Sequence, residues 1–205
     1  MRGLWILLTF GCVVAGASAQ PVPEEKARFG VVPNFEFYPQ NTPRAALATA
    51  IKLLEAKRYD YFLAHIVDAE VLGAKIADRA GKIEPDVEKQ LLAKRDEQKR
   101  SPEPVNARDR VPIEPKEFSA AVRAEAIDRS FRYVVADLKT HLAEYPEHLP
   151  LFRKFLAEDK LVGTGTAAKF TRADAPTQVL HFTNDGKRWH LEDRQTDEPK
   201  PMPGK

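Results

Sequence analysis

Cysteine is almost absent from this chain, which has one, Cys12, among 205 residues. A single thiol cannot form a disulfide within the chain, so its fold depends on an apolar core. Cys12 also lies in the N-terminal segment that we expect to be removed. The mature protein therefore has neither a disulfide nor a Cys–His pair for catalysis.

A charge excess of one sign is also missing. The 32 Lys and Arg against 30 Asp and Glu give a formal net charge of +2, which falls to +1 if Arg2 leaves with the N-terminal segment. A nearly neutral chain creates no field that attracts nucleic acid. No basic stripe is interleaved with aromatic residues either, so we predict no nucleic-acid partner.

The chain has no apolar run long enough to cross a bilayer, which takes about 20 residues. Its main apolar run, residues 4–14, follows Arg2 and precedes the small residues Ala17-Ser18-Ala19. This order is typical of a secretory signal peptide cut after residue 19. We predict export to a periplasmic or extracellular location and no membrane span after cleavage. A retained anchor, or lipid attachment at Cys12, fits the pattern less well.

The most regular pattern lies near the C-terminus, in residues 177–194. Apolar and polar residues alternate on both sides of Asn184-Asp185-Gly186, which predicts a half-buried β-hairpin. With Asp185-Gly186 as a two-residue loop, Phe182 faces Trp189 and Leu180 faces Leu191. These four side chains then share the buried face.

The same register places four polar side chains on the solvent face of the hairpin, with His181 directly opposite His190; the other two are Thr183 and Arg188. A three-residue loop over residues 184–186 is the competing arrangement. It would pair Phe182 with Arg188 and mix the two faces, so the burial pattern disfavours it.

Helical segments precede the hairpin. Thr42-Pro43 is a helix start followed by an apolar stripe: Ala46, Leu47, Ala50, Ile51 and Leu54. Asp60 is the expected N-cap of a second helix, which runs to a stop at Gly81 unless it breaks after Asp68. Residues 84–114 are rich in charges of alternating sign and predict a solvated excursion.

A long helix over about 116–143 and a short helix around Phe155 come next. Residues 160–172 predict one further strand, which could bind a protein partner if its edge is uncovered. The expected fold class is α+β, with a helix-rich N-terminal two-thirds packed on a C-terminal three-stranded antiparallel meander.

The predicted domain organisation has four parts. Residues 1–19 are a signal peptide, and residues 20–41 are an extended arm or linker. Residues 42–194 form a single α+β domain that includes the charged excursion at about 84–114. Residues 195–205 contain three prolines and no packing residues, so they are predicted to be a disordered tail.

The helix start at residues 42–47, the helix at Asp60-Tyr61-Phe62 and the closing hairpin at residues 184–189 resemble small exported bacterial proteins of no assigned function. They are also distantly similar to NTF2-like (cystatin-like) α+β domains, over about residues 41–68 and 161–194. The resemblance implies helices wrapped around a curved antiparallel sheet. The NTF2-like family includes both small-molecule enzymes and non-catalytic modules. The helix-rich middle of this chain departs from that family.

Two groups of residues are candidates for chemistry. His181 and His190 could share a metal ion, but a metal site usually needs a third or fourth ligand, and only Glu192 and Asp193 are near in sequence. We therefore predict no metal and no cofactor. Asp60, His65 and Asp68 are candidate acid–base residues if the second helix lines an NTF2-like cavity.

No complete catalytic motif accompanies these residues: the sequence contains no nucleophile elbow, no zinc-protease helix and no phosphate-binding loop. The first functional hypothesis is a non-enzymatic exported domain that works by binding or by envelope interaction, with an unknown partner. The alternative is a small-molecule-binding or catalytic NTF2-like pocket protein. A pocket lined by His65, Asp68 and a tyrosine would favour the alternative.

Overall fold

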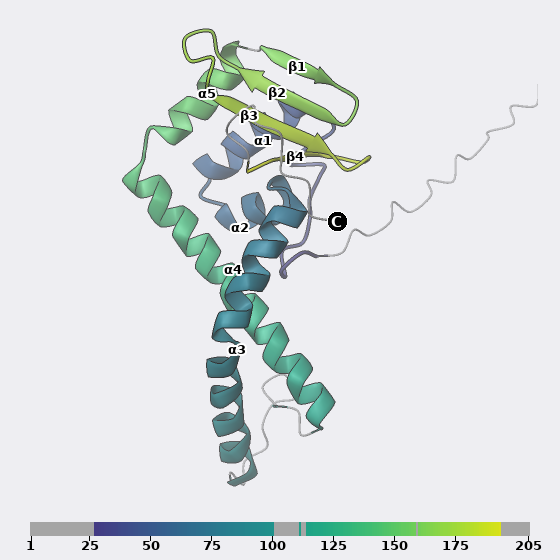
Figure 1. Cartoon of the computed structure of the whole chain (residues 1–205), viewed down its shortest axis with the longest axis vertical. Helices are drawn as coiled ribbons and strands as arrows, with labels where there is room; N and C mark the ends of the chain where they lie inside the picture. The colour runs from purple at the N-terminus through teal and green to yellow at the C-terminus, as the bar shows by residue number, and fades with distance from the viewer. Residues whose placement is uncertain (1–26, 101–110, 112–113, 159, 194–205) are drawn as a thin grey trace, which may run out of the picture.

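The computed structural model describes residues 27–100, 111, 114–158 and 160–193 (Figure 1). The predicted signal peptide, the first part of the predicted linker and the predicted C-terminal tail lie outside these residues. Within them the helices come first and one antiparallel sheet follows, so the chain is an α+β protein, as predicted. No helix in the described ranges has the length and apolar character needed to span a membrane.

Helix α1 (Pro43–Glu55) begins as the sequence predicts. The Thr42 hydroxyl accepts a hydrogen bond from the Ala45 backbone N–H at 3.0 Å, and Pro43 occupies the first turn. The predicted stripe is buried throughout: Ala46, Leu47, Ala50, Ile51 and Leu54. This face packs against helix α5 (His148–Glu158) and strand β4 (Trp189–Leu191), which secures α1 in the main core.

Two short pieces follow, α2 (Tyr59–Tyr61) and the π-helical turn η1 (Phe62–Ile66). The predicted role of Asp60 as an N-cap is wrong. Asp60 lies inside α2, whose N-cap is Arg58, and the two side chains form an ion pair at 3.4 Å. The Asp60 carboxylate therefore pairs with Arg58 at an exposed turn and does not cap a helix.

The alternative break near Asp68 is the arrangement observed. Val67 is extended, with ψ of 144°, and ends η1. Asp68 then caps α3 (Ala69–Arg100), because its carboxylate accepts the backbone N–H groups of Glu70 at 2.8 Å and Val71 at 3.2 Å.

Helix α3 does not stop at Gly81, contrary to the prediction. It continues through Pro85 as a helix of 32 residues. Pro85 has no N–H for the carbonyl four residues earlier, which belongs to Gly81, and such a gap favours a bend. Figure 1 shows that α3 bends part-way along its length. The helix survives because its far half packs on α4 (Pro115–Glu144) through a second apolar cluster: Ala80, Val87, Val111, Phe118, Val122 and Ala126.

Helices α3 and α4 form an antiparallel hairpin that extends away from the sheet (Figure 1). Arg79 pairs with Asp137 at 2.6 Å, and further out Arg129 donates to Gln90 at 2.6 Å. The described part of the charged segment 84–114 is therefore packed on α4 along its apolar stripe.

Helix α5 (His148–Glu158) leads into a sheet of four strands in the order β1-β2-β3-β4: Leu161–Thr164, Ala167–Thr171, Val179–Asn184 and Trp189–Leu191. The prediction had three strands. The segment 160–172 folds into two, because Gly165 adopts a φ of +65° and turns the chain back, so that Gly163 pairs with Ala168. Strand β1 is one edge of the sheet and exposes Val162.

The β3–β4 hairpin has a different register from the prediction. Phe182 pairs with Leu191 and Asn184 pairs with Trp189, which leaves four residues, 185–188, in the loop. A register change of two residues keeps every side chain on its predicted face. The predicted buried quartet therefore lies in or against the main core: Leu180, Phe182, Trp189 and Leu191. The predicted opposition of His181 and His190 is wrong, since Thr183 is the partner of His190.

The N-terminal arm lies on the main core. Phe29 stacks on Phe131 of α4 with ring centroids 4.9 Å apart, and Tyr38 is 8% exposed. Phe29 and Gly30 both have positive φ, which turns the chain so that Arg28 and Val31 exchange backbone hydrogen bonds of 3.0 Å. This turn directs the Arg28 side chain toward the start of α3.

Candidate functional site

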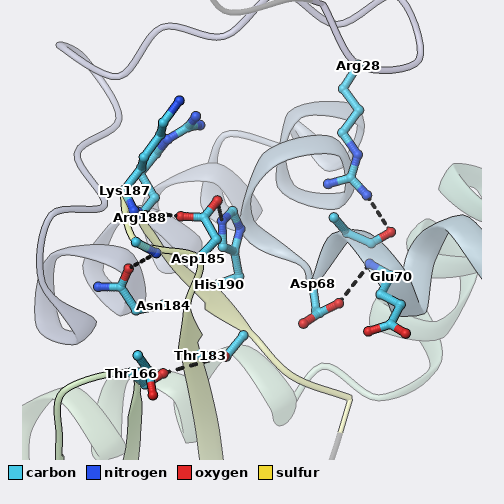
Figure 2. A network of polar contacts seen from close by, with 12 residues as sticks. Arg28, Asp68, Glu70, Thr166, Thr183, Asn184, Asp185, Lys187, Arg188 and His190 are labelled. Carbon is cyan, nitrogen blue, oxygen red and sulfur yellow. Dashed lines mark hydrogen bonds and ion pairs between the residues drawn. The ribbon is translucent and has the colours of Figure 1, made fainter. Parts of the chain in front are cut away.

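A cleft of about 420 Å³ lies between the start of α3 and the β3–β4 loop. Its helical wall consists of Ala64, His65, Asp68, Ala69 and Glu70, and its sheet wall consists of Thr183, Asp185, Arg188 and His190. Arg28 from the arm completes the lining. Figure 2 shows Arg28, Asp68 and Glu70 on one side of this space, and Asp185, Arg188 and His190 on the other.

His65 is buried in the wall of the cleft, 5% exposed. Its Nε2 lies 3.0 Å from the Val31 carbonyl oxygen, which can only accept, so Nε2 carries the proton and donates. Burial lowers the pKa of His65 below its ordinary value, and the nearby Arg28 and His190 act in the same direction. His65 is therefore held as a neutral ring with a fixed tautomer.

Arg28 ties the arm to the helical wall. Its guanidinium donates to the backbone carbonyl oxygens of Ala64 and Ala69, each at 2.9 Å. Burial lowers the pKa of Arg28, and the charge of Asp68 opposes that change. The guanidinium thus satisfies carbonyl groups between the end of η1 and the start of α3.

Asp185 organises the sheet wall. Its Oδ1 accepts the backbone N–H groups of Lys187 and Arg188, each at 2.8 Å, while its Oδ2 lies 3.1 Å from His190 Nε2 (Figure 2). Partial burial would raise the pKa of Asp185, but these hydrogen bonds outweigh it and the pKa is lowered. The ionised carboxylate therefore accepts from His190 Nε2–H.

His190 is 8% exposed, and its second ring nitrogen, Nδ1, is closed off from water. Nδ1 has no hydrogen-bond partner within the part of the chain that the structure describes. A buried polar atom without a partner is uncommon and calls for an explanation. The prediction that His190 is a solvated histidine on the sheet face is wrong, and the same holds for His181, which is 5% exposed.

Arg188 closes the outer rim of the sheet wall. Its guanidinium carbon lies 3.6 Å from the centre of the Phe35 ring, which is a close cation–π contact. Burial lowers the pKa of Arg188. Phe35 also meets His65 edge-on at 5.9 Å, so the arm joins the two walls.

The structure brings together only part of the predicted site. His65, Asp68 and His190 meet in the cleft, whereas Asp60 and His181 do not line it. Tyr61 packs on the His65 ring at 4.7 Å but lines a separate hollow formed mainly by residues 32–38. The tyrosine expected beside His65 and Asp68 is therefore absent from the cleft.

Four charged residues of the cleft were missed by the sequence reasoning: Arg28, Glu70, Asp185 and Arg188. Asp185 and Arg188 had been assigned only to the hairpin, and Arg28 only to a linker. Within the described residues, no three His, Cys, Asp or Glu side chains are arranged to hold a metal ion. The comparisons with known proteins add no further constraint: no protein-family model, no curated protein and no solved structure matches the chain.

Proposed function

We propose that this protein is an exported, non-enzymatic binding protein that holds a small polar ligand in the cleft between α3 and the β3–β4 loop. The observation that carries the proposal is the cleft itself. Its volume of about 420 Å³ is within the range of small-molecule sites, and His190 from the sheet joins His65 and Asp68, which lie more than 120 residues earlier in the chain.

Binding is favoured over catalysis by the residues that line the cleft. They include neither cysteine, serine nor lysine, and the Thr183 hydroxyl lies 3.5 Å from a backbone carbonyl that it can donate to, that of Thr166. The Asp185–His190 pair could move a proton, which is the support for the alternative of a catalytic NTF2-like pocket. Without an activated nucleophile beside it, we assign this pair to ligand binding.

A ligand-observed NMR screen tests the proposal. The probes are small amines, acids, alcohols and sugars, offered to the full chain and to an Ala69→Phe variant. Ala69 is an exposed residue of the cleft wall, so a phenyl ring there fills space without disturbing a buried contact. We expect at least one probe to bind the wild-type chain and to lose its binding in Ala69→Phe.

Ala77→Phe is the matched control, because Ala77 is exposed on the same helix but does not line the cleft. It should bind the probes as the wild type does. If no probe binds, or if binding survives in Ala69→Phe, the proposed function is wrong. Export is tested separately, by sequencing the N-terminus of the protein from the periplasm or medium, where the proposal expects Gln20.

A further inference from the structure

We infer that the ligand of the cleft is a small organic cation with a protonated amine, held by Asp68 on the helical wall and facing His190 on the sheet wall. This inference depends on the proposed function, because it names the chemical class of the ligand of the same cleft. The hydrogen-bonding capacity that the lining residues retain after their own contacts supports this ligand class.

The two imidazoles have fixed proton positions. His65 donates from Nε2 to the Val31 carbonyl, and His190 donates from Nε2 to the Asp185 carboxylate. In a neutral ring the other nitrogen, Nδ1, can then only accept. The sheet wall therefore presents a buried acceptor that lacks a donor, His190 Nδ1.

The two arginine side chains that line the cleft contact other parts of the protein. Arg28 donates to two backbone carbonyl oxygens, and the guanidinium of Arg188 lies on the Phe35 ring. Asp68 lies on the opposite wall (Figure 2), and its Oδ1 accepts both helix-capping N–H groups. A carboxylate has two oxygens and about four acceptor sites, so this cap leaves capacity on Asp68 for a ligand donor.

The charge balance of the cleft agrees with a cationic ligand. Two arginines and three carboxylates line it, so its net charge is −1 while both imidazoles are neutral. An ammonium group carries a positive charge and several donors, which matches the carboxylate of Asp68 on one wall and the acceptor character of the neutral His190 ring on the other. An anionic ligand would meet the like charges of Asp68, Glu70 and Asp185.

The test compares three probes of similar size: n-butylammonium, n-butanol and butyrate. Each is titrated into the full chain with ¹⁵N-labelled histidine, and the ring nitrogens are followed by NMR. We expect n-butylammonium to shift the His190 Nδ1 signal with a Kd of about millimolar, as is usual for a ligand of this size. Butanol and butyrate should leave that signal in place.

Asp68→Asn removes the charge but keeps a side chain that can cap α3, so the helix start is retained. We expect it to weaken n-butylammonium binding about tenfold. Asp78→Asn, which neutralises an exposed carboxylate paired with Lys82 on the same helix, should leave binding unchanged. If Asp68→Asn fails to fold, the His190 signal of the wild type still decides between the probes.

The outcomes separate the inference from the proposed function. If butyrate or butanol binds as well as n-butylammonium and Ala69→Phe abolishes that binding, the cleft is a ligand site but the inference is wrong. Unchanged affinity in Asp68→Asn also overturns the inference. If none of the three probes binds and the wider screen also finds nothing, the proposed function fails together with the inference.

Discussion

Trp189 is a large buried side chain of the sheet. It is 8% exposed and lies in the main core with Phe182 and Leu191. Truncation of so large a buried side chain removes its contacts and leaves a cavity. Trp189→Ala should therefore lower the free energy of unfolding by about 3–5 kcal/mol, measured by urea denaturation.

The fluorescence of the same residue provides an independent check. In a chain that begins at Gln20, Trp189 is the only tryptophan, because Trp5 lies in the predicted signal peptide. Its emission should be blue-shifted in the native state and move to the red on unfolding. A native spectrum typical of solvated tryptophan would contradict the burial of this hairpin face.

His65 makes stability depend on pH. Its pKa in the folded protein is lowered below the ordinary 6.5, so the unfolded chain takes up a proton first as the pH falls. The free energy of unfolding should therefore decrease as the pH falls from 6.5 toward the lowered pKa. His65→Gln, which keeps a donor for the Val31 carbonyl, should show a weaker dependence in urea titrations across this range.

His141→Gln is the matched control for this prediction. His141 is exposed near the end of α4, away from the cleft, and its replacement should leave the pH dependence as in the wild type. Equal pH dependence in His65→Gln and the wild type would show that burial of His65 is not the cause.

For single residues, the sequence predicted the burial of the apolar side chains of the hairpin more accurately than their cross-strand partners. Period-two alternation assigns Phe182 and Trp189 to one face, and this assignment survives any register change by two residues. The register itself depends on the loop, where Asp185 accepts two backbone N–H groups and thereby closes four residues. Side-chain hydrogen bonds of this kind do not alter the alternation, so the pattern could not reveal them.

Among the elements, the β1–β2 hairpin depends on one glycine. Gly163 has a φ of +148°, and a Cβ there would lie 2.4 Å from the Ala167 carbonyl oxygen and 2.5 Å from the Ala168 Cα. The partner strand is backbone at this point and cannot move aside. Gly163→Ala should therefore destabilise the protein by about 2 kcal/mol or more, measured by thermal or urea unfolding.

Gly165 in the adjoining turn is the comparison. Its φ is +65°, and a Cβ there meets no atom within 4 Å. Asparagine tolerates this backbone conformation, so Gly165→Asn should cost far less than Gly163→Ala. Equal costs would mean that close approach of the two strands is not what excludes a side chain at residue 163.

The helices show where predictions from neighbouring residues in the sequence succeed and where they fail. The start of α1 follows from Thr42-Pro43, because capping is decided within a few residues. The continuation of α3 through Gly81 and Pro85 is decided by apolar contacts with α4, more than 30 residues further along the chain. Tertiary packing of this kind overrides the unfavourable helix propensity of both residues.

The part of the molecule that the structure describes has two apolar cores. The main core lies between the sheet, α1, α5 and the near ends of α3 and α4, while the second joins the far halves of α3 and α4 together with Val111. Val87→Ala should loosen the second core and speed amide exchange in residues 84–100 and 115–126, measured by mass spectrometry. The Trp189 unfolding midpoint should stay as in the wild type.

Leu72→Ala is the counterpart in the main core, since Leu72 lies on the same helix and is 2% exposed. It should shift the Trp189 midpoint to lower urea. If Val87→Ala shifts that midpoint equally, the two cores unfold as one unit.

The cleft could not be predicted in full because it is assembled from distant segments. Arg28 reaches the carbonyl of Ala64, 36 residues along the chain, and no periodic pattern connects them. His65 and Asp68 were identified because the sequence placed both of them on the predicted second helix. His190 joins them because Val67 bridges Leu191, a parallel contact that local patterns do not encode.

Helix α3 starts in one core and ends beyond the other. With 32 residues it is about 48 Å long at 1.5 Å per residue, and its first turn lines the cleft. It therefore has the geometry of a lever whose short arm is at Asp68. The bend at Pro85 divides this lever, so a tilt of about 5° at the cleft end carries the helix near Pro85, about 24 Å away, through about 2 Å.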